Sequence, residues 1–375
     1  MTCLSTDPPD GFTSEEAFEP VSNGADMDRG GVVAGLLRSR EPSVRWKTRV
    51  LVLGEDPDSR SIRQLREEVR HAPRTRRLLK EFMRPGRRVP RGVYHKWLGC
   101  HWALAALADL GYPGADPALR PAMDRALEMW LRPEYYRESY PGSRSETMAQ
   151  TGTVPCLNGR YRRCASQQGN ALFYATTLEH SPESADRLAE RLLHWQWPDG
   201  GWNCDRNPSA DTSAFAETLT PMLGLYVFGS VRGRTDALEA ADRASEVFLR
   251  RQLFRRIADG TVIRGEFTRL HYPLYWHYDI LGGLKALARL GKVRDPRCHD
   301  ALDLLESKEL AGGGWPAERR FYDLPGEIAR RGTDRVQWGG SGHRLNEWVT
   351  VDALAVLRAA GRSEFGPHTR GNRLG

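Results

Sequence analysis

The sequence lacks most features of secreted, membrane-spanning and β-rich proteins. No stretch of its 375 residues approaches the roughly 18 apolar residues of a membrane span, and its polar, acidic start has no apolar signal segment. The six cysteines form no Cys-x-x-Cys pair, which favours free thiols in a reducing compartment. Long alternating runs typical of strands are also missing. We therefore expect a cytoplasmic, helical protein without a transmembrane segment.

The composition is that of a packed globular protein with a basic surface. Hydrophobic residues make up 40% of the chain, and its eleven tryptophans suggest aromatic-rich packing or an aromatic-lined cavity. The net charge of +7 comes from arginines spread along the chain, including the run at 84–88. Such a run could attract nucleic acid or anionic lipid. Because no recognition motif accompanies it, we expect a solvated basic surface and no nucleic-acid partner.

The chain is organised as a helical repeat. Residues 1–38 are rich in Gly, Ser, Asp and Pro without periodicity, which predicts a disordered tail, and 364–375 form a second tail. Between them, residues 39–363 carry apolar helical segments that stop at Gly54, Gly111, Gly229, Gly291 and Gly361, with a sixth stop expected near residue 175. The spacing predicts six units of roughly 60 residues, each a pair of helices that must stack on its neighbours.

A glycine-rich turn followed by tryptophan occurs twice between the predicted helices. One copy is the stretch 196–202, QWPDGGW, and the other is AGGGWPAE at 311–318. Glycine allows backbone angles that other residues resist, so a tryptophan can pack back over the turn. We interpret the turn as a tight connection from an outer helix to the next inner one, sealed by Trp195, Trp197 and Trp202. Ligand binding by these tryptophans is the alternative.

The Gln-x-x-Asp-Gly-Gly-Trp pattern at 196–202 resembles the repeat of squalene–hopene cyclases and of protein prenyltransferase β subunits. The resemblance covers residues 40–362 as a repeat pattern and is sharpest at 190–225 and 270–318. It is closest to squalene-cyclase-like bacterial proteins of unassigned activity. It implies an all-α (α/α)6 toroid, with six inner helices around a central cavity and six outer helices around them.

The chain departs from both well-known chemistries of these families. The Asp-x-Asp-Asp motif with which class II cyclases protonate an alkene is absent, and so is the metal-binding Asp-Asp-x-x-Asp motif. The zinc-binding Asp-x-Cys of prenyltransferase β subunits is replaced by Asp211-Thr-Ser213, although Cys204 stands nearby. The resemblance thus implies the fold more firmly than it implies a reaction.

Polar and aromatic residues cluster where the inner helices are expected to begin. Helix N-termini suit anions and carboxylates, so a site at the cavity mouth is expected there. The candidate substrate-binding residues are His101, Trp102, Gln167, Asn170, Tyr275, Trp276, Tyr278 and Glu347, and the candidate catalytic residues are Asp211, Glu217, His277 and Asp279. Asp211 could instead be a plain helix N-cap, with Glu217 on an exposed first turn.

The stretch 270–279, LHYPLYWHYD, is the strongest single constellation. Pro273 predicts a helix start, which would place His277 and Asp279 in the first turns. An imidazole near a carboxylate can act as a general base or a metal ligand, although a lone histidine is more often a core residue. Alternatively, Asp211 or Asp279 could be a buried acid among aromatic rings that stabilise a carbocation.

Zinc is the sharper hypothesis for Cys204. With Asp205 (or Asp211) and His277 (or His271) it would supply three protein ligands, the usual number in a catalytic zinc site. Cys204 could also be a small buried hydrophobic residue or a free nucleophile.

Three functions remain open from the sequence. The first is a terpene-cyclase-like or prenyl-substrate enzyme that acts on an apolar small molecule at the mouth of a toroid cavity. The second is a zinc-dependent transferase or lyase on a non-terpenoid substrate. The third is a non-catalytic toroid that binds a peptide or a lipid.

Overall fold

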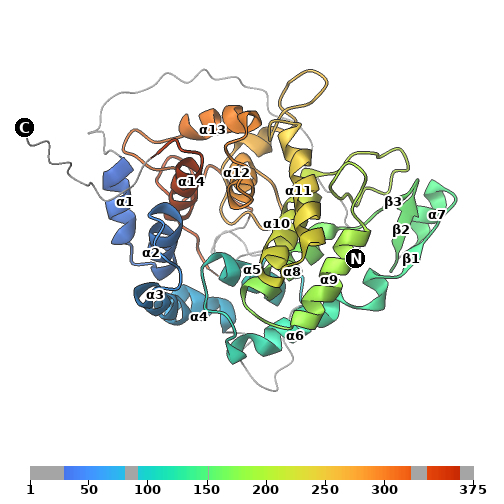
Figure 1. Ribbon diagram of the computed structural model, residues 1–375, viewed down its shortest axis with the longest axis horizontal. Helices are drawn as coiled ribbons and strands as arrows, with labels where there is room; N and C mark the ends of the chain where they lie inside the picture. Colours follow the sequence, from blue (N-terminus) through green and yellow to red (C-terminus); the bar gives the residue numbers. More distant parts are fainter. Residues whose placement is uncertain (1–28, 81–91, 151, 322–335, 364–375) are drawn as a thin grey trace, which may run out of the picture.

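The computed structural model describes residues 29–80, 92–150, 152–321 and 336–363, and these are predominantly helical (Figure 1). The α-helices are α1 (Arg29–Leu37), α2 (Pro42–Lys47), α3 (Arg60–His71), α4 (Pro73–Leu79), α5 (Cys100–Asp109), α6 (Arg120–Trp130), α7 (Arg144–Ala149), α8 (Ala165–Thr177), α9 (Pro182–His194), α10 (Phe215–Arg232), α11 (Thr235–Leu249), α12 (Ile280–Arg289), α13 (His299–Glu306) and α14 (Glu347–Ala359). The prediction of a mainly helical protein is confirmed.

Short elements complete the fold. A π-helical turn, η1 (Thr48–Val52), prolongs α2, and the 3-10 turns are η2 (Pro117–Leu119), η3 (Pro133–Tyr135), η4 (Gly265–Thr268) and η5 (Pro296–Cys298). The strands β1 (Glu138–Ser139), β2 (Val154–Leu157) and β3 (Arg160–Tyr161) form one small sheet in that order. Strand β1 is parallel to β2, and β2 is antiparallel to β3.

The helices pack as consecutive hairpins. Helix α2 packs against α3, α5 against α6, α8 against α9, α10 against α11 and α12 against α13. The first helices of these hairpins also contact one another: α8 lies between α5 and α10, and α12 lies between α10 and α14. Helix α14 in turn contacts α2 and η1, so the end of the repeat packs against its beginning. No hairpin buries its apolar face alone, which is why neighbours must stack.

The predicted tail is shorter than expected. Residues 29–37 form α1, which contacts α2 and η1 and buries Val32, Val33 and Leu36. The prediction of a tail to residue 38 is therefore wrong over these residues, because an apolar stripe within the glycine-rich segment gains burial against the first hairpin. Residues 1–28 and 364–375 lie outside the described residues.

The helix stops follow the predicted repeat, with two changes. Gly54, Gly111, Gly291 and Gly361 all have positive φ and follow the first helices of their units. Gly229 lies inside α10, and the stop is Gly233, with φ of 66°. The missing stop near residue 175 is Glu179, a non-glycine residue at φ of 56°. The left-handed stop is thus present after each of the six segments, and glycine makes five of them.

The two Gly-Gly-Trp turns have the same hydrogen bonds. Trp202 Nε1 donates to the Leu192 carbonyl at 3.0 Å, and Trp315 Nε1 donates to the Leu305 carbonyl at 2.7 Å. The main-chain N–H of each tryptophan donates to a threonine hydroxyl of the following first helix, Thr218 in α10 and Thr350 in α14. The indole thus fastens the preceding helix to the next one. The interpretation of this turn as a structural connection is confirmed.

Glycine is needed in this turn for lack of space as well as for its backbone angle. Gly200 has φ of 104°, and a Cβ there would lie 2.3 Å from the Arg243 carbonyl oxygen. Asp199 accepts hydrogen bonds from the Ser213 N–H and hydroxyl, at 2.7 and 2.6 Å. The Gln196 amide donates to the Gly200 and Ala240 carbonyls, at 2.7 and 2.8 Å. Gln196, Asp199, Gly200 and Trp202 of the QWPDGGW pattern are therefore all required for the structure of the turn.

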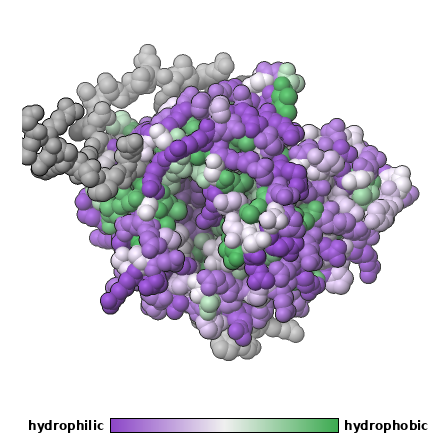
Figure 2. Space-filling view, viewed as in Figure 1, coloured by the Kyte–Doolittle hydropathy of each residue, from purple (hydrophilic) through white to green (hydrophobic). Residues whose placement is uncertain are grey.

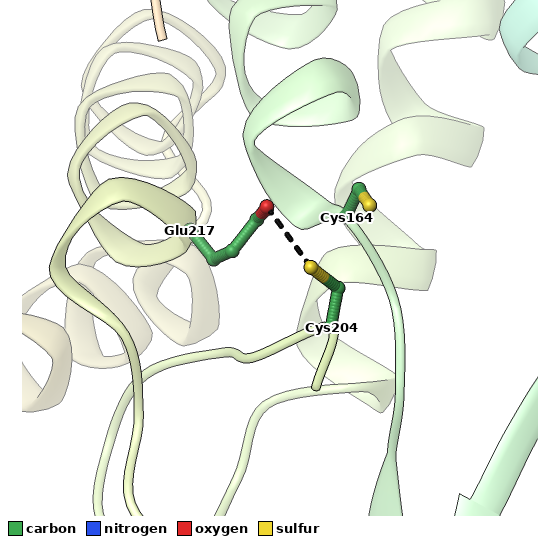
Figure 3. Close-up of side chains that lie close together, drawn as sticks. All are labelled: Cys164, Cys204 and Glu217. Atoms are coloured by element: carbon green, nitrogen blue, oxygen red, sulfur yellow. Dashed lines mark hydrogen bonds between the residues drawn. The ribbon is translucent and has the colours of Figure 1, made fainter. Parts of the chain in front are cut away.

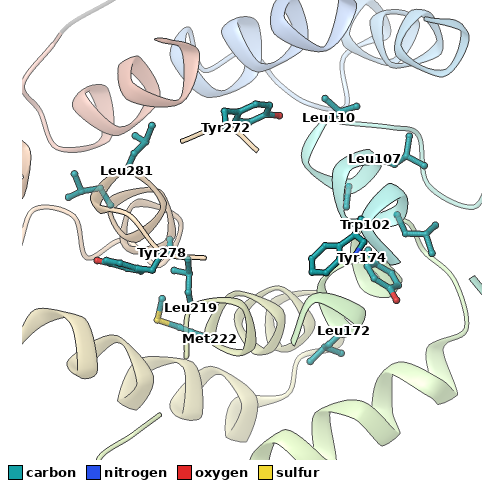
Figure 4. Packing of buried hydrophobic residues seen from close by; sticks show 14 of the residues in the cluster. Trp102, Leu107, Leu110, Leu172, Tyr174, Leu219, Met222, Tyr272, Tyr278 and Leu281 are labelled. Carbon is teal, nitrogen blue, oxygen red and sulfur yellow. The ribbon is translucent and has the colours of Figure 1, made fainter. Parts of the chain in front are cut away.

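Much of the surface on one face of the molecule is hydrophilic, with apolar residues gathered in separate patches (Figure 2). The core beneath is aromatic-rich, and Trp130, Trp195, Trp202, Trp315 and Trp338 are among its largest fully buried side chains. Most tryptophans thus serve packing, as the composition suggested. Trp102, Leu219 and Leu281, from α5, α10 and α12, lie around the middle of the core (Figure 4).

Candidate functional site

A cavity of about 360 Å³ lies among the first helices of the hairpins. Its wall receives residues from α2 and η1, α5, α8, α10, α12 and α14, and from the segment 271–279. Aromatic side chains on the wall are Trp46, Trp102, Phe173, Tyr272, Tyr275 and Trp338. The volume is at the lower end of the range of small-molecule sites, about 300–1,000 Å³. The cavity is therefore the candidate functional site.

Four charged side chains form a closed network on the cavity wall. The Lys47 Nζ lies 2.6 Å from an Asp109 oxygen and 3.2 Å from an Asp352 oxygen. The Lys285 Nζ lies 3.1 and 2.5 Å from the other oxygens of the same two carboxylates. The Tyr272 hydroxyl donates to Asp109 at 3.0 Å. Each carboxylate thus bridges two ammonium groups from helices that are distant in sequence.

The network shifts the pKa values of Asp109, Lys285 and Tyr272. Burial by itself raises the pKa of the Asp109 carboxyl, but Lys285 and Lys47 outweigh it and hold that pKa well below its usual range. Burial lowers the pKa of Lys285, and the two aspartates more than reverse this, so the pKa is raised. Burial and the nearby carboxylates raise the pKa of Tyr272 well above its usual value, which keeps the phenol neutral. Asp109 is therefore held as a carboxylate and Lys285 as an ammonium ion, each stabilised by the other.

Arg289 is a cavity-lining cation outside this network of ion pairs. Its guanidinium lies 5.6 Å from the centre of the Phe173 ring, and it makes no hydrogen bond or ion pair with the described residues. Among the described residues, the indole N–H groups of two cavity residues, Trp46 and Trp102, are buried and have no hydrogen-bond partner. The wall therefore offers a positive charge next to aromatic surface.

At the N-terminal end of α12 the cavity wall contains His271 and Asp279. Asp279 caps this helix through the Gly282 N–H at 2.7 Å, and it accepts from the His271 N–H at 2.8 Å and lies 3.2 Å from His271 Nδ1. The other ring nitrogen of His271 lies 3.3 Å from a Glu266 oxygen. The helix begins at Ile280 and not near Pro273, because Asp279 provides the cap.

Four of the predicted site residues line the cavity: Trp102, Asn170, Tyr275 and Asp279. They come from α5, α8 and the segment before α12, as expected for a site near the N-terminal ends of these helices. His271, considered as an alternative ligand, lines it too.

The other predicted substrate-binding residues lie away from the cavity wall. These are His101, Gln167, Trp276, Tyr278 and Glu347. His101 is enclosed by Trp102, Trp130 and Tyr174, and burial lowers its pKa to about 3. Tyr278 donates to the Leu253 carbonyl at 2.7 Å and packs on Phe248. Both are core residues: His101 lies on the side of α5 that packs on α6 and α8, and Tyr278 belongs to the irregular segment 270–279, whose side chains point in several directions.

Asp211 and His277 do not meet the conditions set for them. Asp211 is exposed and not among aromatic rings, and Ala214 is the N-cap of α10, so it is neither a buried acid nor the cap. The His277 ring stacks on Phe321 at 3.4 Å between centroids, and burial lowers its pKa to about 3. It is therefore a neutral, packed imidazole near neutral pH.

Cys204 lies in a different ligand group from the one expected. Its thiol, the thiol of Cys164 and the carboxylate of Glu217 have ligand atoms within 4.8 Å of one another (Figure 3). Within the described ranges no such group includes Asp205 or His277. Asp205 is exposed and its Oδ1 accepts from the Asn207 N–H, while His277 packs on another segment. Glu217 is buried, and not on an exposed turn.

Sequence reasoning missed the ion network and Cys164. Asp109, Lys285 and Asp352 each interrupt an apolar helical run, and that isolation is the signal that could have found them, whereas Lys47 lies between Arg45 and Arg49 and gives no such signal. A charged residue within an apolar stripe needs a partner. Which partner it has depends on contacts up to 305 positions apart.

Comparison with known proteins adds no family. The sequence matches no protein-family model, and it has no significant similarity to a curated protein. Among the described residues, no helix has the length and apolar character needed to cross a membrane. The features of this protein that point to a function are therefore the cavity and the group of Cys164, Cys204 and Glu217.

Proposed function

We propose that the hairpins close into an (α/α)6 toroid and that the central cavity is the active site of an enzyme acting on a small isoprenoid-like molecule. Contacts among the first helices, from α5 through α14 back to α2, support the closure. Among the described residues, no helix follows α14 in the sequence. In this arrangement α1, which packs on α2 and η1, takes the place of the sixth outer helix.

The observation that carries the proposal is that the cavity wall has both an aromatic part and a positively charged part. Trp102, Phe173 and Tyr275 offer aromatic faces to a hydrocarbon chain. Arg289, which lies outside the ion network, offers positive charge on the same wall. A ligand that satisfies both parts has an apolar body and a polar or anionic end.

Among isoprenoid reactions, the wall favours one that starts at such a polar end over protonation of an alkene. Asp109 and Asp352 are each paired with two lysines, and the Asp279 oxygens accept from His271 and Gly282. These three are the aspartates of the described cavity wall, and the oxygens of each already contact basic side chains or N–H groups of the protein. A protonated acid facing the substrate is what alkene protonation requires.

Ligand binding tests the proposal through the cavity tryptophans. We expect a diphosphate ester of an isoprenoid alcohol to change tryptophan fluorescence at lower concentration than the free alcohol. Ala355→Phe, which fills the cavity, should weaken both ligands. Arg289→Gln should weaken the ester about tenfold, the loss of one charged hydrogen bond, and spare the alcohol. Arg256→Gln, at an exposed position outside the cavity, is the matched control.

Product analysis by mass spectrometry separates the functions. Conversion of the bound ester supports an enzyme, whereas tight binding without conversion favours the non-catalytic alternative. If neither ligand binds, or if Ala355→Phe binds as the wild type does, the cavity is not the site.

A further inference from the structure

Three separate segments bring Cys164, Cys204 and Glu217 together outside the cavity (Figure 3). Cys164 is the residue before α8, Cys204 lies in the loop that follows the Gly-Gly-Trp turn, and Glu217 is in the first turn of α10. The Cys204 Sγ lies 3.4 Å from Glu217 Oε1. Two sulfurs and one carboxylate oxygen thus converge at the N-terminal ends of two adjacent helices.

The separation of Cys204 and Glu217 matches that of two ligands on one zinc ion. With Zn–S of about 2.3 Å and Zn–O of about 2.0 Å at a tetrahedral angle, a sulfur and an oxygen ligand are about 3.5 Å apart. The observed 3.4 Å agrees with this edge. Thiolates select zinc and other thiophilic metals over magnesium and calcium, which prefer all-oxygen shells.

The backbone holds the two cysteine segments in register. Residues Arg162 and Asn203 form a parallel bridge, and the Arg163 N–H donates to the Asn203 carbonyl at 3.3 Å. The Asn203 side chain donates to the Thr212 carbonyl at 2.9 Å, which closes the loop that carries Cys204. The two thiols therefore meet as a result of main-chain pairing and not of side-chain reach.

Glu217 is oriented as a ligand with one oxygen. The Ser166 N–H donates to its Oε2 at 2.9 Å, which leaves Oε1 as the oxygen toward Cys204. A hydrogen bond to the second oxygen is the usual outer-shell support of a metal-bound carboxylate. Glu217 is also buried, so its position is fixed by packing.

A helix N-terminus lies at the group, because Cys164 is the N-cap residue of the 13-residue helix α8. A zinc ion with two thiolates and one carboxylate carries a net negative charge, which the partial positive charge of a helix N-terminus stabilises. We infer that Cys164, Cys204 and Glu217 bind one zinc ion with three protein ligands, independently of the cavity.

Cobalt(II) is the probe for this site, because it replaces zinc and its thiolate complexes absorb light. The full chain is reduced, stripped of metal with a chelator, and titrated with Co²⁺ and then Zn²⁺. We expect one Co²⁺ per chain, with a sulfur-to-cobalt band that Zn²⁺ removes, and release of thiol protons on binding. Cys164→Ser and Cys204→Ser should weaken binding about 100-fold or more, and Glu217→Gln about tenfold or more.

Cys156→Ser is the matched control, since Cys156 is a half-buried thiol on the neighbouring strand β2 and lies outside the group. It should bind Co²⁺ as the wild type does. The inference is overturned by the absence of a band in the wild type, or by a band that survives in Cys164→Ser. Should the cysteine variants fail to fold, thiol labelling of the wild type decides: Zn²⁺ must protect Cys164 and Cys204 and leave Cys156 equally reactive.

Discussion

Acid sensitivity from His101 follows directly from its surroundings. Its Nδ1 accepts from Trp130 Nε1 at 3.0 Å and lies 3.3 Å from the Tyr174 hydroxyl, so a proton on Nδ1 would face the indole N–H. Burial lowers its pKa from 6.5 to about 3. In the unfolded chain the ring takes up a proton near pH 6.5, whereas in the folded chain it does so only near pH 3.

This difference in pKa fixes the sign and the size of the change in the free energy of unfolding with pH. The unfolded state binds more protons between pH 6.5 and 3, so the stability conferred by neutral His101 is fully present above pH 6.5 and is lost as the pH falls. One proton corresponds to about 1.4 kcal/mol per pH unit. From pH 6.5 to 4.5 the free energy of unfolding should fall by about 2.3 kcal/mol from His101 alone, because the unfolded ring is only half protonated at pH 6.5.

Urea unfolding at a series of pH values measures this slope. We expect His101→Gln, whose side-chain oxygen can still accept from Trp130, to be less stable at pH 7 and to lose stability less steeply toward pH 4.5. His299→Gln, at an exposed position, should keep the wild-type slope. Parallel curves for the wild type and His101→Gln would refute the reasoning, because they would mean that His101 protonates alike in the folded and unfolded chain.

Two further predictions concern stability. Gly200→Ala should destabilise the protein by about 2 kcal/mol or more, because its Cβ would meet the Arg243 carbonyl, whereas Gly233→Ala, with positive φ and open space, should cost about 1 kcal/mol in urea unfolding. Equal losses would show that the backbone angle alone matters. Lys47→Met should cost about 3–5 kcal/mol in the same assay, since it leaves the buried Asp352 and the half-buried Asp109 with a single lysine, and a loss below about 1 kcal/mol would contradict the network.

The repeat was predictable because its signals are local. The glycine stops depend on a backbone angle that glycine adopts easily, and the Gly-Gly-Trp turns depend on a close approach within a few residues. Glu179 shows the limit of such signals, because a non-glycine residue takes the same angle where the unit requires a stop.

The candidate sites were only partly predictable. Trp102, Asn170, Tyr275 and Asp279 were expected at the cavity because they lie near the starts of first helices, but so does His101, which packs into the core. Consecutive residues such as His101 and Trp102 point about 100° apart around the helix axis, and the helix's rotation about that axis depends on its neighbours.

The sequence by itself determined the paired helices, their stops and the tight turns between them, since these follow from periodicity and backbone angles over a few residues. Only the tertiary structure decided which charges and thiols meet. Lys47 joins Asp352, and Cys164 joins Cys204, through the packing of first helices and the pairing of Arg162 with Asn203. Such contacts depend on how whole hairpins stack, which no local pattern encodes.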